Sequence, residues 1–362
     1  MKRNRDLIVT HENASTPQPQ SANCSQQTLL RLKNLVIIGD VFCDIIALDV
    51  KLIDSWGTDT LSKEIRVLAG GSALNIAIHG ANYSALFGSH VKIHFFSEIG
   101  TDFQGEVCRK ALNHQCIDSS KLNAKIGNRT GSCIVLSGAT DRSFVTDRGC
   151  IKDLSLNCFE EKDYLSESNG HIHVGGFYNC DTLQAEVPEL LKRAKSLGMT
   201  TSLNPQYDAT GDWGGMQAIC PYLTFFIGND TELASVVKSK VCGETSINAA
   251  VLLNWGCATV IVTLGDRGVI AFKRKEHSKT DHCTSENLEC HSHPAYNVDV
   301  VDTTGAGDAF AGGFLVEWMI SQQLVPSLRA GCVASGAAVT QVGGSSSNIA
   351  SLEQVSSKSQ LV

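Results

Sequence analysis

The sequence contains few aromatic residues, few prolines and no closely spaced cysteine pairs. Of its 362 residues, 6% are aromatic and 7 are proline, and none of the 14 cysteines belongs to a Cys-x-x-Cys motif. No apolar run approaches the roughly 18 residues of a membrane-spanning helix, so we expect no membrane partner. A net charge of −7 and only 4 tryptophans disfavour nucleic acid as a partner. A hydrophobic content of 43% supplies a packed core instead.

The cysteines are spread along the chain from Cys24 to Cys332. A small secreted scaffold held by disulfides would be shorter and richer in cysteine. The apolar patch near the start of the sequence, residues 7–9, is too short for the core of a signal peptide. We therefore expect reduced cysteines and a cytoplasmic protein.

The pattern divides the chain into a polar tail, one large domain and a short C-terminal tail. Residues 1–33 contain few apolar side chains and predict a disordered tail. Between 34 and 350, short apolar runs alternate with segments of helical spacing, which is typical of a mostly parallel α/β sheet with covered faces. Residues 45–68 and 130–147 are extended and half-polar, and we expect them to form a small lid sheet. Residues 351–362 are assigned to the C-terminal tail.

The strongest motif is Asp-Thr-Thr-Gly-Ala-Gly-Asp at residues 302–308, before an amphipathic segment. Small residues at Gly305, Ala306 and Gly307 leave backbone N–H groups uncovered at the positive end of a helix, which predicts an anion site suited to phosphate. Asp308 falls in the first turn of that helix, where a carboxylate beside an anion is unfavourable unless it acts as a base or holds a metal. The alternative is that Asp308 only favours the helix N-terminus.

Two other phosphate-binding motifs are absent from the sequence. There is no Gly-x-x-x-x-Gly-Lys-Ser/Thr segment, which excludes a P-loop protein. A dinucleotide fingerprint starting at Gly305 fails at its sixth position, Phe310. The sequence therefore argues against a nicotinamide-dependent oxidoreductase.

A second motif lies at residues 69–77, where a Gly70-Gly71 turn opens a predicted helix and Asn75 lies one turn in. The glycines allow the backbone to approach a ligand closely, and the amide both donates and accepts hydrogen bonds. This arrangement suits a polyol. A plain turn with a helix cap is the alternative.

Taken together, the two motifs resemble the two signatures of the PfkB, or ribokinase-like, family of sugar and nucleoside kinases, over about residues 35–350. The resemblance implies a doubly wound α/β sheet with helices on both faces and a small β-sheet lid. It also implies an ATP-dependent kinase in which Asp308 takes the proton from the acceptor hydroxyl. The amides of Gly305, Ala306 and Gly307 would form the anion hole for the transferred phosphoryl group.

The resemblance assigns further residues to the substrate, the nucleotide and Mg²⁺. The positions that match the family's substrate-binding residues are Asp44, Gly70, Gly71 and Asn75. Those that match its nucleotide and magnesium residues are Asn229, Glu232, Thr263, Gly265 and Gly268. The first two belong to an Asn-x-x-Glu motif with hard oxygen ligands, and the same spacing also predicts a helix-capping box.

Some members of the family carry a monovalent-cation site beside the anion hole, so the resemblance makes K⁺ a possible cofactor besides ATP and Mg²⁺. Its positions in this sequence are Asp302, Thr304, Ala338, Gln341, Gly343 and Ser347. Asp302 also has a simpler interpretation, as a residue that forms hydrogen bonds at the end of a strand.

The sequence departs from ribokinases proper on the substrate side. Ser72 stands where they have lysine, Phe42 stands where they have asparagine, and residues 175–178 contain no carboxylate. Phe42 removes a ligand for a hydroxyl and offers a stacking face. A sugar (ribose-like, or another furanose or hexose) and a nucleoside are therefore both retained as acceptors. A catalytically inactive, kinase-like regulatory binding protein is the alternative of another class, and the resemblance also implies a homodimer formed through the lid.

Overall fold

The computed structural model describes residues 33–51, 57, 59–89, 91–138, 142–165, 170–239, 244–275, 282–346 and 349–359. Of the expected tail at 1–33, only Lys33 lies among these residues, and it begins the first strand. Ser347, predicted for the cation site, lies outside the described residues.

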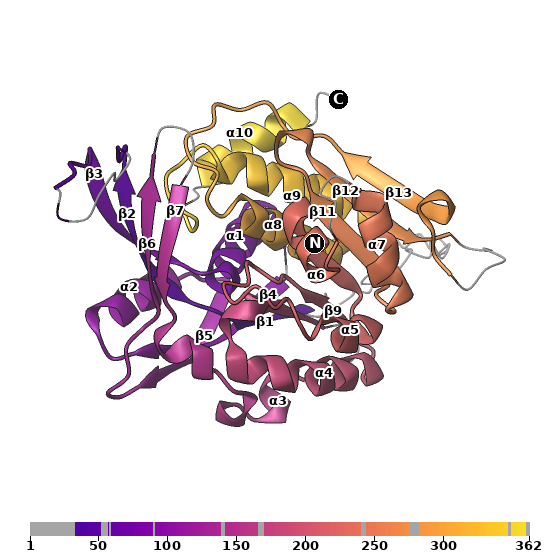
Figure 1. Ribbon diagram of the computed structural model, residues 1–362, viewed down its shortest axis with the longest axis horizontal. Coiled ribbons are helices and arrows are strands. Elements are labelled where there is room, and N and C mark those ends of the chain that lie inside the picture. The colour runs from indigo at the N-terminus through magenta and orange to yellow at the C-terminus, as the bar shows by residue number, and fades with distance from the viewer. Residues whose placement is uncertain are drawn as a thin grey trace, which may run out of the picture. The chain divides into compact units, whose positions relative to one another are not determined.

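A nine-stranded sheet forms the centre of the domain, as the alternating pattern predicted (Figure 1). The strand order is β13-β12-β11-β10-β9-β8-β1-β4-β5, and only the β11·β12 and β12·β13 pairs are antiparallel. The strands are β1 (Lys33–Gly39), β4 (Val91–Gly100), β5 (Ile117–Lys125), β8 (His171–Gly175), β9 (Thr200–Leu203), β10 (Phe225–Asn229), β11 (Thr259–Thr263), β12 (Val269–Arg274) and β13 (Leu288–His293). Strand β1 is buried along residues 35–38, because both faces of a parallel sheet are covered.

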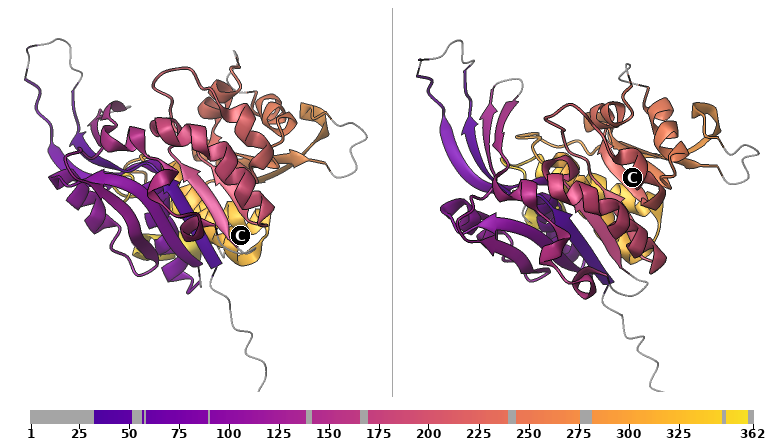
Figure 2. Two further views of the ribbon diagram at one scale, coloured as in Figure 1. Left: turned by 90° about the horizontal axis from the view of Figure 1, so that it is seen from below. Right: turned by 60° about the horizontal axis from the view of Figure 1, so that its bottom comes forward.

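Helices cover both faces of this sheet (Figures 1 and 2). On one face lie α1 (Ser72–Leu86) and α8 (Ala306–Ser321), with α9 (Leu324–Ala338) and α10 (Ile349–Ser359) packed beyond them. On the other face α4 (Asp181–Ser196) packs against β9. The shorter helices are α2 (Phe103–Ala111), α3 (Glu161–Tyr164), α5 (Met216–Ile219), α6 (Asp230–Val236) and α7 (Thr245–Asn254).

Small residues allow helices α1 and α8 to approach each other closely. A Cβ atom added at Gly312 of α8 would lie 2.7 Å from the backbone of both Gly80 and Ile76 in α1. The alanine stripe of α1 is buried at Ala73 and Ala77, so the same helix also packs closely on the sheet. This packing fixes the first turn of α1 beside the first turn of α8.

The lid is a separate four-stranded sheet, in the order β3-β2-β6-β7. Its strands are β2 (Phe42–Leu48), β3 (Glu64–Gly70), β6 (Ser132–Ser137) and β7 (Arg142–Asp147). The outer pairs are antiparallel and the central β2·β6 pair is parallel. Figure 2 shows the lid strands projecting from one edge of the domain. The expected small β-sheet lid is therefore confirmed, and its first strand begins at Phe42, before the expected start at 45.

The end of the chain differs from the sequence expectation. Helix α10 occupies Ile349–Ser359, where we expected a C-terminal tail from 351. The helix forms because Leu352 and Val355 are buried in a small apolar cluster with Val333 of α9. Within the described part of the chain, no helix is both long and apolar enough to cross a membrane.

Candidate active site

A cleft of about 630 Å³ lies between the lid and the carboxyl ends of the central parallel strands. Parallel α/β sheets bind ligands at this edge. The lid and its flanks supply Phe42, Asp44, Cys133, Arg142, Phe144, Thr146 and Arg148. The strand ends and the loops after them supply Asp40, Asn179, Asn204, Gln206, Tyr207, Ala209, Ile227, Gly228, Asn229, Glu232 and Thr263. The first turns of α1 and α8, with the loop before α8, supply Gly71, Ser72, Asn75 and residues 303–308.

Asp308 is held by side chains from two other segments. Its Oδ1 accepts a hydrogen bond of 2.8 Å from Ser72 Oγ, and its Oδ2 accepts one of 2.9 Å from Asn75 Nδ2. Gln206 Nε2, from the loop after β9, lies 3.4 Å from the same Oδ1. The carboxylate is 5% exposed, so its orientation is fixed before any ligand binds. Asn75 also carries a buried Oδ1 with no protein hydrogen-bond partner among the described residues.

Burial shifts the proton affinity of the carboxylates in the cleft. It raises the pKa of Asp308 to about 7, although the hydrogen bonds from Asn75 and Ser72 act in the opposite direction. Burial also raises the pKa of Asp44 to about 7, and the nearby charges of Asp40 and Asp308 add to that shift. A carboxylate with a pKa near neutrality is suited to accepting a proton during a reaction.

Gly70 shapes the substrate side of the cleft by leaving room for Asp44. A Cβ atom at Gly70 would lie 2.0 Å from Asp44 Oδ2, so any side chain there would displace the carboxylate. Gly71 follows with a φ of 95°, a left-handed conformation that favours glycine, and it precedes α1. The structure thus brings three of the four predicted substrate residues, Asp44, Gly71 and Asn75, into the cleft wall and places Gly70 directly behind Asp44.

The three predicted anion-hole residues begin helix α8 and line the cleft. The first N–H groups of a helix have no partner within it, which leaves them available to an anion. The N–H of Ala306 already donates to the carbonyl of Thr303 at 3.3 Å. Gly305 has a φ of 74°, and a Cβ there would lie 2.5 Å from the carbonyl oxygen of Gly344. Only glycine therefore fits at the turn before the helix.

Asn229, Glu232 and Thr263 also line the cleft. Asn229 Oδ1 accepts from the N–H of Glu232 at 2.8 Å, and Glu232 Oε2 accepts from the N–H of Asn229 at 2.9 Å. The predicted capping box is therefore present. Burial raises the pKa of Glu232 to about 7. The other predicted nucleotide residues, Gly265 and Gly268, lie outside the cleft wall, in the turn after β11.

Two of the predicted cation positions, Thr304 and Gly343, contact Asp302. Its Oδ1 accepts from the N–H and the hydroxyl of Thr304, and its Oδ2 accepts from the N–H of Gly343 at 2.9 Å. Ala338 and Gln341 share a turn, since the N–H of Gln341 donates to the carbonyl of Ala338. Among the members of this group that the structure describes, Thr304 alone lines the cleft.

Several cleft residues were missed by sequence reasoning. Arg142 of β7 donates to Thr303 Oγ1 at 2.6 Å and lies 3.6 Å from Asp302, directly before the anion-hole residues. Arg148, just beyond β7, pairs with Asp181 at the start of α4. The signal that could have found them is the presence of cations within a predicted lid. Ser72 was noted only as a departure from the family pattern, and Gln206 was not noted at all.

Comparison with known proteins identifies the family. The model of the pfkB family carbohydrate kinases matches residues 32–351. The chain belongs to the pfkB family of carbohydrate kinases. Among curated relatives, this pfkB-family protein is 26% identical to a ribokinase of Haemophilus influenzae over 328 residues, which cover 87% of this chain and 95% of the relative. It is 27% identical to an adenosine kinase of Schizophyllum commune over 304 residues, which cover 77% of this chain and 81% of the relative.

Solved structures show the same fold. The ribokinase of Arabidopsis thaliana, solved with ribose and ATP, matches this pfkB-family protein with a TM-score of 0.69 and 20% identity. The match covers 89% of this chain and 98% of the ribokinase. The resemblance and the fold class expected from the sequence are therefore confirmed.

Proposed function

We propose that the protein transfers the γ-phosphoryl group of ATP to a hydroxyl of a sugar. The observation that carries this proposal is the position of Asp308. Its buried carboxylate lies in the first turn of α8, directly after the amides of Gly305, Ala306 and Gly307, and in one cleft with them. A carboxylate beside helix N–H groups supports the proposal, because phosphoryl transfer to a hydroxyl requires a base next to an anion site.

In this mechanism Asp308 accepts the proton of the acceptor hydroxyl as the hydroxyl oxygen attacks the γ-phosphorus. The bond from the γ-phosphorus to the β,γ-bridging oxygen breaks, and ADP leaves. Ser72 and Asn75 hold the carboxylate in one orientation through their hydrogen bonds. The N–H groups at the start of α8 stabilise the negative charge that develops on the phosphoryl oxygens. Asp44 and Asn75 orient the acceptor from the lid side and the helix side, and the lid excludes water that would otherwise take the phosphoryl group.

Metal ions enter the proposal through two groups of residues. Asn229 and Glu232 would hold Mg²⁺, directly or through water, because their oxygens are hard ligands and line the cleft. When bound, Mg²⁺ supplies charge neutralisation on the phosphates. We propose that K⁺ binds to the loop that is held by hydrogen bonds to Asp302, through carbonyl oxygens such as that of Ala338. Faster turnover in K⁺ than in Na⁺ or choline, reduced in Asp302→Ala, is the expected result.

A nucleoside acceptor is the second candidate, and aromatic side chains support it. Phe42, Phe144 and Tyr207 all line the cleft, where Phe42 is buried but Phe144 is 54% and Tyr207 68% exposed. Exposed rings offer stacking faces for a base. The adenosine kinase relative agrees with this candidate.

We also propose a homodimer formed through the lid. Strand pairing places Val67, Ile45, Ile134 and Val145 opposite one another in a row across all four strands. Val145 is 60% exposed. One residue along each strand, Asp44, Cys133 and Thr146 form a second row whose side chains point to the opposite face of the sheet, and all three line the cleft. The apolar row therefore faces away from the site. A cytoplasmic location stays a prediction.

The experiment that tests the proposed function measures ATP consumption with Mg²⁺ against a panel of pentoses, hexoses and nucleosides. The wild-type protein is expected to turn over one acceptor class, and Asp308→Asn to lose at least about a thousandfold in turnover. Asp153→Asn, an exposed aspartate outside the cleft wall, is the matched control and should retain full activity. Unchanged turnover in Asp308→Asn would contradict the role of the base. Binding of acceptors without any turnover by the wild type would favour the regulatory binding protein.

A further inference from the structure

The loop after β9 presents a strained side chain to the candidate base. Gln206 has a φ of 60°, in the left-handed region that residues other than Gly, Asn and Asp rarely adopt. Such conformations persist where the surrounding structure over-determines them, and they concentrate at functional sites. Gln206 lines the cleft, and its Nε2 lies 3.4 Å from Asp308 Oδ1.

The segment just before Gln206 is fastened to the central sheet. Asn204 donates its N–H to the carbonyl of Val174 in β8, and its Oδ1 accepts from the N–H of Gln206 at 3.1 Å. The carbonyl of Pro205 accepts from the N–H of Tyr178 at 3.1 Å. The backbone at both Asn204 and Pro205, the two residues before Gln206, is therefore held in place by hydrogen bonds.

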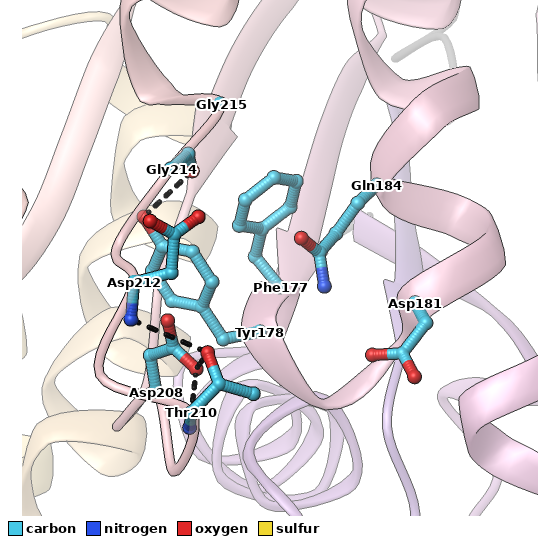
Figure 3. Close-up of a pocket in the computed structure, with 9 residues that line it drawn as sticks. All are labelled: Phe177, Tyr178, Asp181, Gln184, Asp208, Thr210, Asp212, Gly214 and Gly215. Carbon is cyan, nitrogen blue, oxygen red and sulfur yellow. Dashed lines mark hydrogen bonds between the residues drawn. The ribbon is translucent and has the colours of Figure 1, made fainter.

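The segment after Gln206 is fastened as well, around a second cavity of about 270 Å³ (Figure 3). Asp208 accepts from the N–H and hydroxyl of Thr210 through Oδ1 and from the N–H of Trp213 through Oδ2. Tyr178, which points into this cavity wall, donates its hydroxyl to the carbonyl of Gly214 at 3.1 Å (Figure 3). The loop is thus a rigid support, and it holds the conformation of Gln206 in place.

We propose that Gln206 is a specificity-determining residue, whose side-chain amide binds the hydroxyl of the acceptor next to the one that is phosphorylated. The inference rests on the proposed function of Asp308 as the base. The reacting hydroxyl must hydrogen-bond to Asp308, and the Gln206 amide lies 3.4 Å from Asp308 Oδ1, so both are neighbours of the same carboxylate. An amide in that position is within reach of a hydroxyl on the carbon next to the reacting one. The amide exchanges its long contact with the carboxylate for a normal hydrogen bond to that hydroxyl.

The residue type agrees with this assignment. Glycine would adopt this backbone conformation without strain. A glutamine at this position therefore indicates that its side chain has a function. An amide both donates to and accepts from a hydroxyl, which allows it to recognise the hydroxyl as a partner rather than only to repel or attract charge. The neighbouring Tyr207 is 68% exposed and also lines the cleft, so the same rigid loop supplies an apolar face beside the polar contact.

The test compares Gln206→Gly and Gln206→Asn with the wild type. The probes are D-ribose, D-fructose and adenosine, each with its analogues that lack one hydroxyl. We measure kcat/KM with ATP, and acceptor binding without ATP by calorimetry. The wild type should discriminate about 10- to 100-fold against one deoxy analogue of its acceptor. In Gln206→Gly, kcat/KM should fall for the complete acceptor but not for that deoxy analogue, so the discrimination is lost. Gln206→Asn, whose amide side chain is shorter, should keep part of the discrimination.

Gln322→Gly is the matched control. Gln322 has a φ of 55°, is exposed, and ends the 16-residue helix α8 at the end opposite to Asp308. This change relieves the same kind of strain and should leave discrimination unchanged. Full discrimination in Gln206→Gly, or an equal loss on the complete acceptor and all analogues, overturns the assignment. If the wild type binds the acceptor but does not turn it over, the proposed function fails, and selective loss of binding in Gln206→Gly still supports the inference.

Discussion

The hydroxyl of Ser72 donates a hydrogen bond of 2.8 Å to Oδ1 of Asp308, 236 residues further along the chain. The bond connects the first turn of α1 to the first turn of α8, and both residues are buried. A donor that bonds to a carboxylate favours its ionised form, so Ser72 keeps Asp308 more acidic than burial alone would allow.

The Ser72 bond leads to a prediction for the pH dependence of turnover. The base must be ionised to accept a proton, so kcat/KM should fall as the pH drops through about 7, the pKa of Asp308. Ser72→Ala removes a bond that lowers this pKa and should move the acidic limb upward by about 0.5 to 1 pH unit. Ser84→Ala, at another buried serine of α1, should leave the limb in place. The measurement is a pH–rate profile, and an unmoved limb in Ser72→Ala would contradict the role of the bond.

The raised pKa of Asp308 also predicts that its ionised carboxylate destabilises the fold. Its folded pKa of about 7 lies above the usual value, so its contribution to stability is present at low pH and is lost as the pH rises through 7. Asp308→Asn should therefore raise the free energy of unfolding at pH 8 more than at pH 5, by on the order of 2 kcal/mol. Denaturant unfolding at the two pH values measures this difference. An equal change at both would show that burial does not govern this carboxyl.

Arg142 joins the lid to the loop before the anion hole. Its bond to Thr303 places a guanidinium where phosphate charge would develop. Arg142→Ala is expected to lower kcat about 100-fold, and Arg142→Lys to recover only part of it, because lysine lacks the planar fork. Arg66→Ala is the control, since Arg66 is a lid arginine bonded to Glu64 of its own strand. Steady-state kinetics with both substrates measure the effect. A normal kcat in Arg142→Ala would show that this lid residue takes no part in phosphoryl transfer.

Two glycines of the proposed anion hole should respond differently to alanine. Gly305→Ala places a Cβ 2.5 Å from the Gly344 carbonyl at a φ of 74°, so it should lower stability by about 1 to 3 kcal/mol. A Cβ at Gly307 meets nothing within 4 Å, so Gly307→Ala should fold normally. It should still lose more than about tenfold in turnover, because the methyl group occupies the anion site. Thermal unfolding and turnover of both variants check this. Full activity of Gly307→Ala would place the phosphoryl group elsewhere.

The apolar row of the lid predicts the oligomeric state. Val145→Lys and Ile134→Lys place charges on the exposed face and should convert a dimer into monomers. Thr182→Lys, at an exposed position on α4, should stay dimeric. Light scattering after gel filtration at micromolar concentration distinguishes the two states. A monomeric wild type would show that the row does not form a dimer interface.

The sequence by itself determined the class of fold and the core of the site. Parallel strands buried on both faces leave continuous apolar runs such as Leu35–Ile38, and a helix packed on a sheet leaves a periodic stripe such as that of α1. The candidate site could be recognised in segment 302–308, because a turn, a helix start and the carboxylate proposed as the base are adjacent in the chain. The sequence did not predict strands that lack such patterns: β9 has only four residues, and β5 is mostly polar.

Only the tertiary structure decided which side chains meet Asp308. Ser72 reaches it because Gly80 and Gly312 let α1 and α8 approach closely. Gln206 reaches it because an anchored loop holds a strained backbone. Ser72 lies within the Gly-Gly motif at residues 69–77, but the motif does not show that its hydroxyl meets Asp308, and nothing in the neighbours of Gln206 along the chain marks that residue. Their roles depend on contacts between segments more than 100 residues apart, which packing of the whole domain creates and no local pattern records.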